Sequence, residues 1–158
     1  MEKPSVYIES SAIIYYTAKR PREIVAAAHQ EITIDWWEEA LIKFEPFISQ
    51  FVIDEISRGD SDAAQKRLAV ISSFKVLAMT SDVASLANKY YVVLNIPENA
   101  RTDTYHIALS VFHGMDYLVT WNCKHIAAGR VRAIIEAINS KLGYFTPTIC
   151  TPEELMEV

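Results

Sequence analysis

The sequence contains little cysteine and little glycine. Only two of its 158 residues are cysteines and four are glycines, whereas 51% are hydrophobic. Cys123 and Cys150 stand alone, without a CxxC pair or Cys/His spacing, so we expect two reduced thiols and no structural zinc. The composition excludes a fibrous or disordered chain and predicts one compact domain over residues 1–158.

Long hydrophobic runs and an excess of positive charge are also missing. No apolar run approaches the roughly 20 residues that a membrane span needs, and MEKPSVYIES lacks a signal-peptide pattern, so we expect a cytoplasmic protein. The formal charge of -5 repels a phosphate backbone in general. A nucleic-acid partner would therefore need a local basic patch or bridging cations.

Short β-favouring runs alternate with longer helical patterns along the whole chain. Alternation of this kind predicts an α/β fold, a three-layer α/β/α sandwich with a central and mostly parallel sheet. The expected strands cover residues 6–8, 46–49, 75–79, 117–120 and 145–150. The expected helices begin near Ser11 and Ser49, cover residues 24–44, 61–74, 81–94, 103–113 and 125–142, and end with a short one after Pro152.

The pattern over residues 24–44 predicts one long helix, bent near Thr33, with an apolar stripe. Trp37 and Leu41 widen this stripe beyond what one core contact needs, which suggests a partner-binding or dimer surface. The alternative is that these side chains simply pack on the sheet. The stripe consists of Ile24, Ala28, Ile32, Trp36, Ala40 and Phe44.

Four polar side chains fall at or near the expected carboxyl ends of strands. Glu9 follows the first strand, Glu55 lies early in the helix after the second, Asp103 opens the helix before the fourth, and Asn122 follows the fourth. Ligands of open α/β sheets gather at this edge, so we expect the four to surround one cleft. The alternatives are a helix-capping role for Glu9 and an exposed ion pair with Arg58 for Glu55.

Three carboxylates held this close repel one another strongly in a low dielectric. A bound divalent cation would relieve this repulsion, and a set of oxygen ligands suits Mg²⁺ or Mn²⁺ better than zinc. We therefore expect a metal site formed by Glu9, Glu55 and Asp103.

The same residues lie in segments that resemble the signature blocks of the PIN-domain family. The segments YIESS, SQFVIDE, DTYHIAL and DYLVTWN occur in the family's order, and in size and layout the chain is similar to VapC-like toxins of toxin–antitoxin pairs. By this resemblance, Glu9, Glu55 and Asp103 match three metal-binding acids and Asn122 falls on the position of a fourth. Ser10 and Thr120 match positions that steady the acids by hydrogen bonding.

The resemblance implies a metal-dependent endoribonuclease that cleaves RNA phosphodiesters with a metal-activated water. It also implies an antitoxin partner and a homodimer. Two alternatives stay open: a PIN-like module that binds RNA or protein without cleaving, because Asn122 lacks a charge, and a receiver-like phosphoacceptor domain.

Several other polar residues near these segments have expected roles. Arg101 and Lys124 are the preferred contacts for substrate phosphates, because they lie nearest the acids in sequence. Asp116 precedes its strand, so we expect it at the opposite edge of the sheet. We expect His106, one helical turn after Asp103, to be a packed core residue rather than a ligand.

Overall fold

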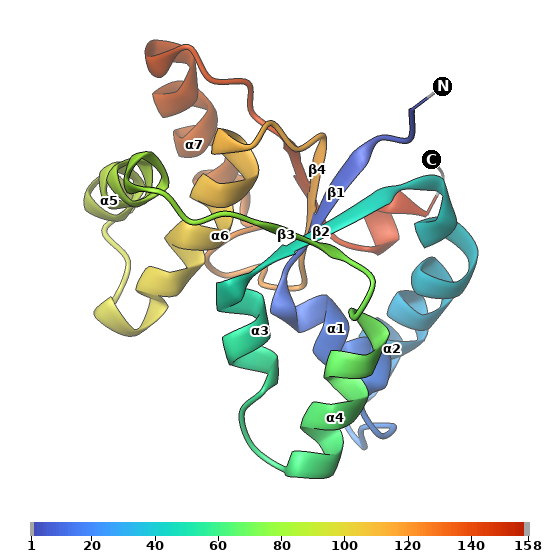
Figure 1. Cartoon of the computed structure of the whole chain (residues 1–158). Helices are drawn as coiled ribbons and strands as arrows, with labels where there is room; N and C mark the ends of the chain where they lie inside the picture. Colours follow the sequence, from blue (N-terminus) through green and yellow to red (C-terminus); the bar gives the residue numbers. More distant parts are fainter. Residues whose placement is uncertain (1, 157–158) are drawn as a thin grey trace.

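The structure is a computed structural model that describes residues 2–156. Strands and helices alternate along the chain, as predicted (Figure 1). The first half contains β1 (Ser5–Ile8), α1 (Ser10–Thr17), α2 (Ile24–Asp35), the π-helix η1 (Trp36–Ala40), the 3₁₀ turn η2 (Leu41–Lys43), β2 (Glu45–Ser49), α3 (Gln50–Ile56) and α4 (Ser61–Val70). The second half contains β3 (Lys75–Leu77), α5 (Ser81–Leu94), η3 (Glu98–Ala100), α6 (Arg101–Phe112), β4 (Tyr117–Val119), α7 (Gly129–Leu142), β5 (Thr148–Cys150) and η4 (Glu153–Leu155).

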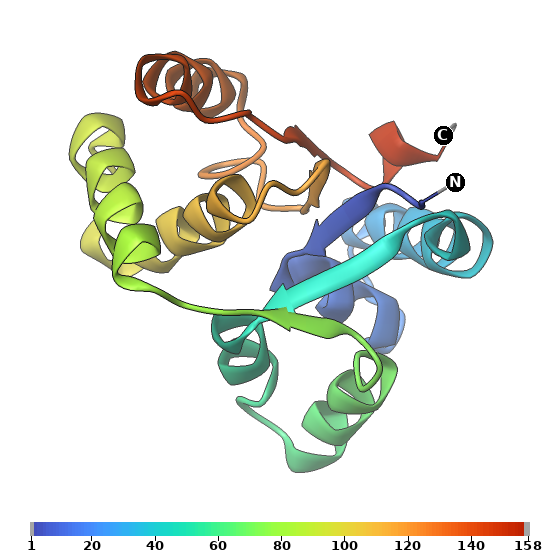
Figure 2. The ribbon, with the colours of Figure 1, turned by 45° about the horizontal axis from the view of Figure 1, so that its top comes forward.

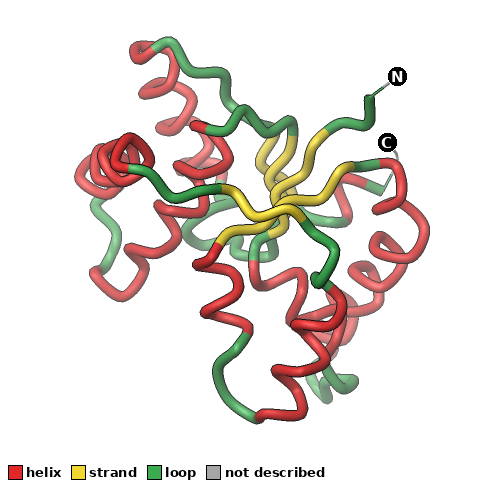
Figure 3. The backbone as a smooth tube through the Cα atoms, in the orientation of Figure 1, coloured by secondary structure: helices red, strands yellow, loops and turns green. Residues whose placement is uncertain are grey.

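The strands form a central sheet in the order β3-β2-β1-β4-β5, and all four neighbouring pairs are parallel. Helices α1 to α4 gather on one side of the sheet and α5 to α7 on the other (Figures 1 and 2). Figure 3 shows the strands enclosed between these two groups of helices. The predicted α/β/α sandwich with a parallel sheet is confirmed.

The direction of the strand order reverses between β1 and β4. From β1 the chain proceeds to β2 and β3 on one side, and then returns through α5 and α6 to β4 on the other side. Helices α1 to α4 therefore lie on one face of the sheet and α5 to α7 on the other, and in open α/β sheets ligands bind at the carboxyl ends of the strands at such a switch point. Glu9 directly follows β1 and Thr120 directly follows β4, so both residues lie at this switch point.

β1 is the central strand because its side chains are apolar or aromatic on both faces. Val6, Tyr7 and Ile8 are fully buried within one hydrophobic cluster that includes residues from both helical layers. Burial on both faces is typical of a strand in a parallel sheet. The packing of β1 thereby fixes the position at which Glu9 leaves the sheet.

Asp116 lies at the opposite edge of the sheet, as predicted. Its carboxylate accepts hydrogen bonds from the backbone N–H (2.8 Å) and the hydroxyl (3.1 Å) of Ser5, at the start of β1. The Ser5 hydroxyl accepts a bond from the Asp116 backbone N–H (2.9 Å). This reciprocal pair ties the amino ends of β1 and β4 together and sets their register.

The helical segment after Arg22 differs from the predicted single helix. Its wide π turn begins at Trp36 rather than in a bend at Thr33. The first half of the predicted stripe does not face the core, because Ile24 is 83% exposed and the buried residues of α2 are Gln30 and Thr33. Both are satisfied by hydrogen bonds, which is what permits polar groups to be buried there.

The aromatic side chains of η1 mostly pack within the protein. Trp36 is fully buried, and Trp37 stacks on Tyr16 with ring centroids 4.4 Å apart and also contacts Phe74. These contacts favour the packing alternative for this stripe over the partner surface.

Several predicted ends of elements were wrong by a few residues. The helix expected from residue 125 begins at Gly129, because the Asn122 side-chain oxygen and backbone carbonyl accept N–H groups of residues 125–127 and hold a turn there. The helix expected over residues 61–74 ends at Val70, and the strands expected over 75–79 and 145–150 are only three residues long. Among residues 2–156, no helix combines the length and apolar character needed to cross a bilayer.

A buried polar pair joins the outer helices α5 and α7. Tyr90 donates its hydroxyl hydrogen to Asn139, whose amide donates to Thr146 (2.9 Å), and both Tyr90 and Asn139 are fully buried. We predict that Asn139→Ala lowers the free energy of unfolding by about 1–3 kcal/mol, because it leaves the Tyr90 hydroxyl without a partner.

Urea denaturation measures this loss. The neighbouring exposed Ser140→Ala is the matched control, with an expected change within about 0.5 kcal/mol. Equal effects of the two substitutions would contradict the role of the pair.

Candidate metal centre at the carboxyl edge of the sheet

Glu9 is a buried carboxylate with only 5% of its surface exposed. Its Oε1 accepts hydrogen bonds from the Thr120 hydroxyl (2.6 Å), the Ser11 backbone N–H (3.2 Å) and the Ser11 hydroxyl. Glu9 therefore caps α1, as one of the two sequence interpretations expected. Among residues 2–156, its other oxygen, Oε2, receives no hydrogen bond, so capping leaves one oxygen for a ligand.

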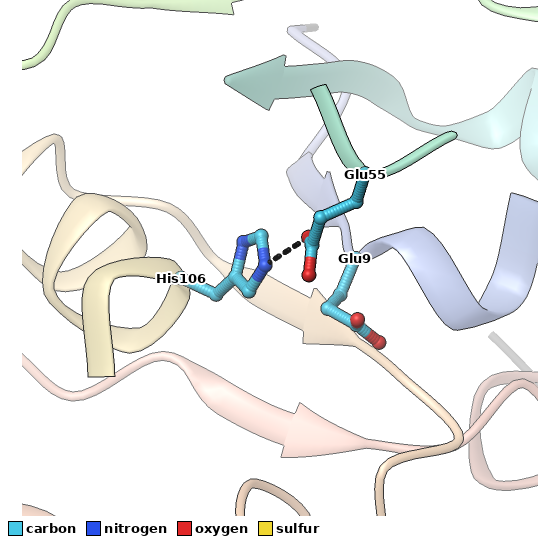
Figure 4. A group of neighbouring side chains, drawn as sticks. All are labelled: Glu9, Glu55 and His106. Atoms are coloured by element: carbon cyan, nitrogen blue, oxygen red, sulfur yellow. Dashed lines mark hydrogen bonds and ion pairs between the residues drawn. The ribbon is translucent and has the colours of Figure 1, made fainter. Parts of the chain in front are cut away.

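Glu55 approaches Glu9 from α3, and its Oε1 is also occupied. The Ser10 hydroxyl donates to this atom (2.7 Å), and Nε2 of His106 is 2.7 Å from it. Figure 4 shows Glu9, Glu55 and His106 converging from the end of β1, from α3 and from α6. One potential ligand atom of each lies within 4.8 Å of the others, which is close enough for one cation to contact all three.

A buried chain of hydrogen bonds holds the His106 ring. Its Nδ1 is 2.6 Å from the Tyr7 hydroxyl, which is 2.8 Å from the Ser49 hydroxyl. His106 is fully buried, as expected for a packed core histidine, but it also contacts a candidate ligand. Ser49 occupies the N-cap position of α3, near the predicted start of that helix, but its hydroxyl makes no capping bond because it is paired with Tyr7.

Asp103 and Asn122 lie beside this group. Asp103 is not among the atoms within 4.8 Å, but Oδ2 of Asp103 is 3.2 Å from Nδ1 of His125, and its charge interacts with Glu9. The Asn122 side-chain amide interacts with the Asp103 carboxylate, while its Oδ1 accepts the backbone N–H of His125 (2.9 Å). Asn122 thus connects the turn after β4 with Asp103. Its amide adds no negative charge to the site.

The pKa values of the cluster show competing effects of burial and charge. Burial raises the pKa of Asp103, and the charge of Glu9 adds to the rise, although His106 and Asn122 oppose it. Burial also acts to raise the pKa of Glu55, but the hydrogen bond and charge of His106 outweigh it, and that pKa is lowered. Burial lowers the pKa of His106, but its bond to Glu55 and the surrounding carboxylates raise it overall.

The two expected phosphate contacts differ in their surroundings. The guanidinium of Arg101 bonds to Asn88 (3.3 Å), lies 3.7 Å from Glu98 and sits over the ring of Tyr91. Lys124 is exposed. Lys124 is therefore the freer of the two to meet a phosphate.

His106 is the member of the cluster that the sequence interpretation left outside the site. A signal was present, because His106 follows Asp103 by three residues and so shares its helix face. Spacing alone could not show that Glu55, distant in sequence, would meet this ring.

No family model and no curated protein matches the sequence. A chain of the crystal structure of VapBC2 from Rickettsia felis bound to a DNA fragment from their promoter matches with a TM-score of 0.55 and 15% sequence identity. The alignment covers 76% of this chain and 89% of that chain. At this identity the likeness shows a shared fold.

The opposite pKa shifts of Glu55 and His106 predict how the stability depends on pH. The raised pKa of His106 gives stability that is present below its ordinary value of 6.5 and is lost as the pH rises through the folded value. The lowered pKa of Glu55 gives stability that is present above 4.5 and is lost as the pH falls through the folded value. The pair therefore stabilises most between these two ordinary values.

We predict that His106→Gln, which keeps a donor for Glu55 but does not titrate, loses more stability at about pH 6 than at about pH 9. Denaturant unfolding with a chelator present measures the difference. The partly exposed His113→Gln serves as the control. A loss of equal size at both pH values would argue against an ion pair.

Proposed function

We propose that this chain is a metal-dependent endoribonuclease of the PIN type that acts as the toxin of a toxin–antitoxin pair in the cytoplasm. The observation that carries the proposal is the group formed by Glu9, Glu55 and His106 at the switch point of a parallel sheet. The fold shared with a chain of the VapBC2 structure supports the same class.

The residues present fit a divalent cation. Each of Glu9 and Glu55 has one oxygen fixed by hydroxyl donors and a second oxygen without a hydrogen bond among residues 2–156. The negative charge of Glu9 contributes to raising the pKa of Asp103, and a cation between them would relieve this repulsion. Glu9 and Glu55 would hold Mg²⁺ or Mn²⁺, with Asp103, which lies beside the group formed with His106, as the third carboxylate, because carboxylate oxygens suit both ions.

When bound, such a cation supplies a Lewis acid that activates water and stabilises the charge that develops on a phosphodiester. The protein's own side chains supply the orientation. Ser10 positions the Glu55 carboxylate, Thr120 positions that of Glu9, and Asn122 positions that of Asp103. The hydroxyls of Ser10 and Ser11 donate to the carboxylates that would hold the metal, so we assign no nucleophilic side chain.

The remaining side chains near the edge would meet the substrate. Lys124 would contact an RNA phosphate, because it is exposed two residues beyond Asn122. Arg101, held by Asn88 and Glu98, would contribute positive potential rather than a flexible contact. We further propose that the chain works as a homodimer with an antitoxin protein.

One observation favours the second candidate, a PIN-like module that binds without cleaving. Asn122 carries no charge, and its oxygen is already used by the backbone of His125. A second cation would lack an anionic ligand on this side. RNA binding without cleavage in either Mg²⁺ or Mn²⁺ would support this candidate.

The proposal predicts that Glu55→Gln lowers Mn²⁺-dependent cleavage of single-stranded RNA by more than about 100-fold. This exceeds the roughly 10–100-fold loss expected when a residue that only hydrogen-bonds to a metal ligand is removed. Asp103→Asn should have the same effect, and a chelator should abolish wild-type cleavage. The substrate is a fluorescently labelled oligoribonucleotide, resolved by electrophoresis.

Asp54→Asn is the matched control for Glu55→Gln. Asp54 precedes Glu55 on α3 but is exposed and bonds only to Gln50 among the described residues, so its loss should leave cleavage unchanged. Cleavage that persists in Glu55→Gln would exclude this site as the source of the activity.

A further inference from the structure

Three aromatic side chains form a cluster beside the carboxylates, outside the proposed metal site. The ring of Trp121, in the turn after β4, stacks on His29 of α2 with centroids 4.0 Å apart and an interplanar angle of 12°. Tyr15 of α1 contacts both rings edge-on, at 5.7 Å from His29 and 6.2 Å from Trp121. All three side chains are only partly buried, unlike Trp36 and Tyr7 in the core.

The Trp121 ring is held in a fixed orientation close to Glu9. The indole N–H donates to the buried Thr33 hydroxyl (2.6 Å). The backbone N–H of Trp121 donates to the Ser11 hydroxyl (2.8 Å), and that hydroxyl in turn donates to Glu9. One hydroxyl group therefore links the backbone that carries the ring to a proposed metal ligand, and little side-chain freedom is left to lose on binding.

The net charge of the protein opposes the binding of RNA, and two of its arginines are already engaged within the protein. The chain has a formal charge of -5. Arg130 donates to the carbonyl of Leu94, and Arg132 donates to the carbonyl of Ile149 and pairs with Glu154. Stacking of bases on aromatic rings supplies affinity for single strands without relying on charge.

We propose that the stacked pair of Trp121 and His29 is a platform for an unpaired base of the RNA, next to the phosphodiester at the carboxylate cluster. The inference rests on the proposed function and restricts its substrate to single-stranded RNA. A paired base is stacked between its neighbours and cannot offer a face to the ring. Tyr15 supports the platform from its edge.

The test measures binding of a short fluorescein-labelled oligouridylate by fluorescence anisotropy, with a chelator present so that no cleavage occurs. The wild type should bind this strand more tightly than an abasic strand of equal length or the same strand in a duplex with oligoadenylate. Trp121→Leu should weaken binding by about 5- to 150-fold. Trp121→Phe, which keeps an aromatic face, should restore much of the affinity.

Trp37→Phe is the control, because Trp37 is also partly buried and stacked, but on Tyr16 rather than on His29. Circular dichroism checks that each variant is folded. If Trp121→Leu does not fold, the comparison of the base-containing and abasic strands on the wild type and on Trp121→Phe decides the question.

The platform is disproved by equal wild-type affinity for the base-containing and abasic strands, by unchanged binding in folded Trp121→Leu, or by no wild-type binding of the single strand. These outcomes differ from a failure of the proposed nuclease. Base-dependent binding without cleavage in any divalent metal would retain the platform and reject the nuclease. Cleavage by Trp121→Leu with an unchanged KM would retain the nuclease and reject the platform.

Discussion

The candidate site depends on holding negatively charged carboxylates close together at one edge of a parallel sheet. Glu9 and Glu55 lie within a group whose ligand atoms are no more than 4.8 Å apart, and the charge of Glu9 acts unfavourably on Asp103. Such proximity is tolerated because each carboxylate is compensated by donors or by His106. The carboxylates therefore gather at the switch point of the sheet, where ligands of open α/β sheets bind.

The compensation comes from the elements that build the core, so the site and the fold are not independent. Tyr7 belongs to the central strand, yet its hydroxyl orients His106, and His106 in turn holds Glu55. Ser10 begins α1 directly after Glu9 and reaches Glu55 on a different helix. Packing of β1 between the two helical layers thus sets the geometry of the carboxylates, which rigid elements position better than loops do.

The aromatic cluster lies at the same edge of the sheet as the carboxylates. Trp121 is joined to Glu9 through the Ser11 hydroxyl, while its ring rests on His29 from a different helix. A cation site and a stacking surface would act on adjacent parts of one nucleotide chain, the phosphate and the base. In the proposed function, the two together would let an acidic protein bind RNA without a basic surface.

The sequence by itself determined the layered α/β architecture. The alternation of buried strands and amphipathic helices is visible in short stretches of sequence and does not depend on how the elements pack. It also placed Glu9 after the first strand, Asp103 on the helix before the fourth and Asp116 at the far edge, since these positions follow from chain direction alone. Only the tertiary structure decided which side chains meet. His106 lies beside Glu9 and Glu55 because α3 and α6 approach each other at the edge of the sheet. Trp121 stacks on His29 because α2 packs beside the turn after β4. The helix expected from residue 125 began later for a related reason: the bonds that Asn122 makes to the following N–H groups compete with helix formation and depend on the three-dimensional turn.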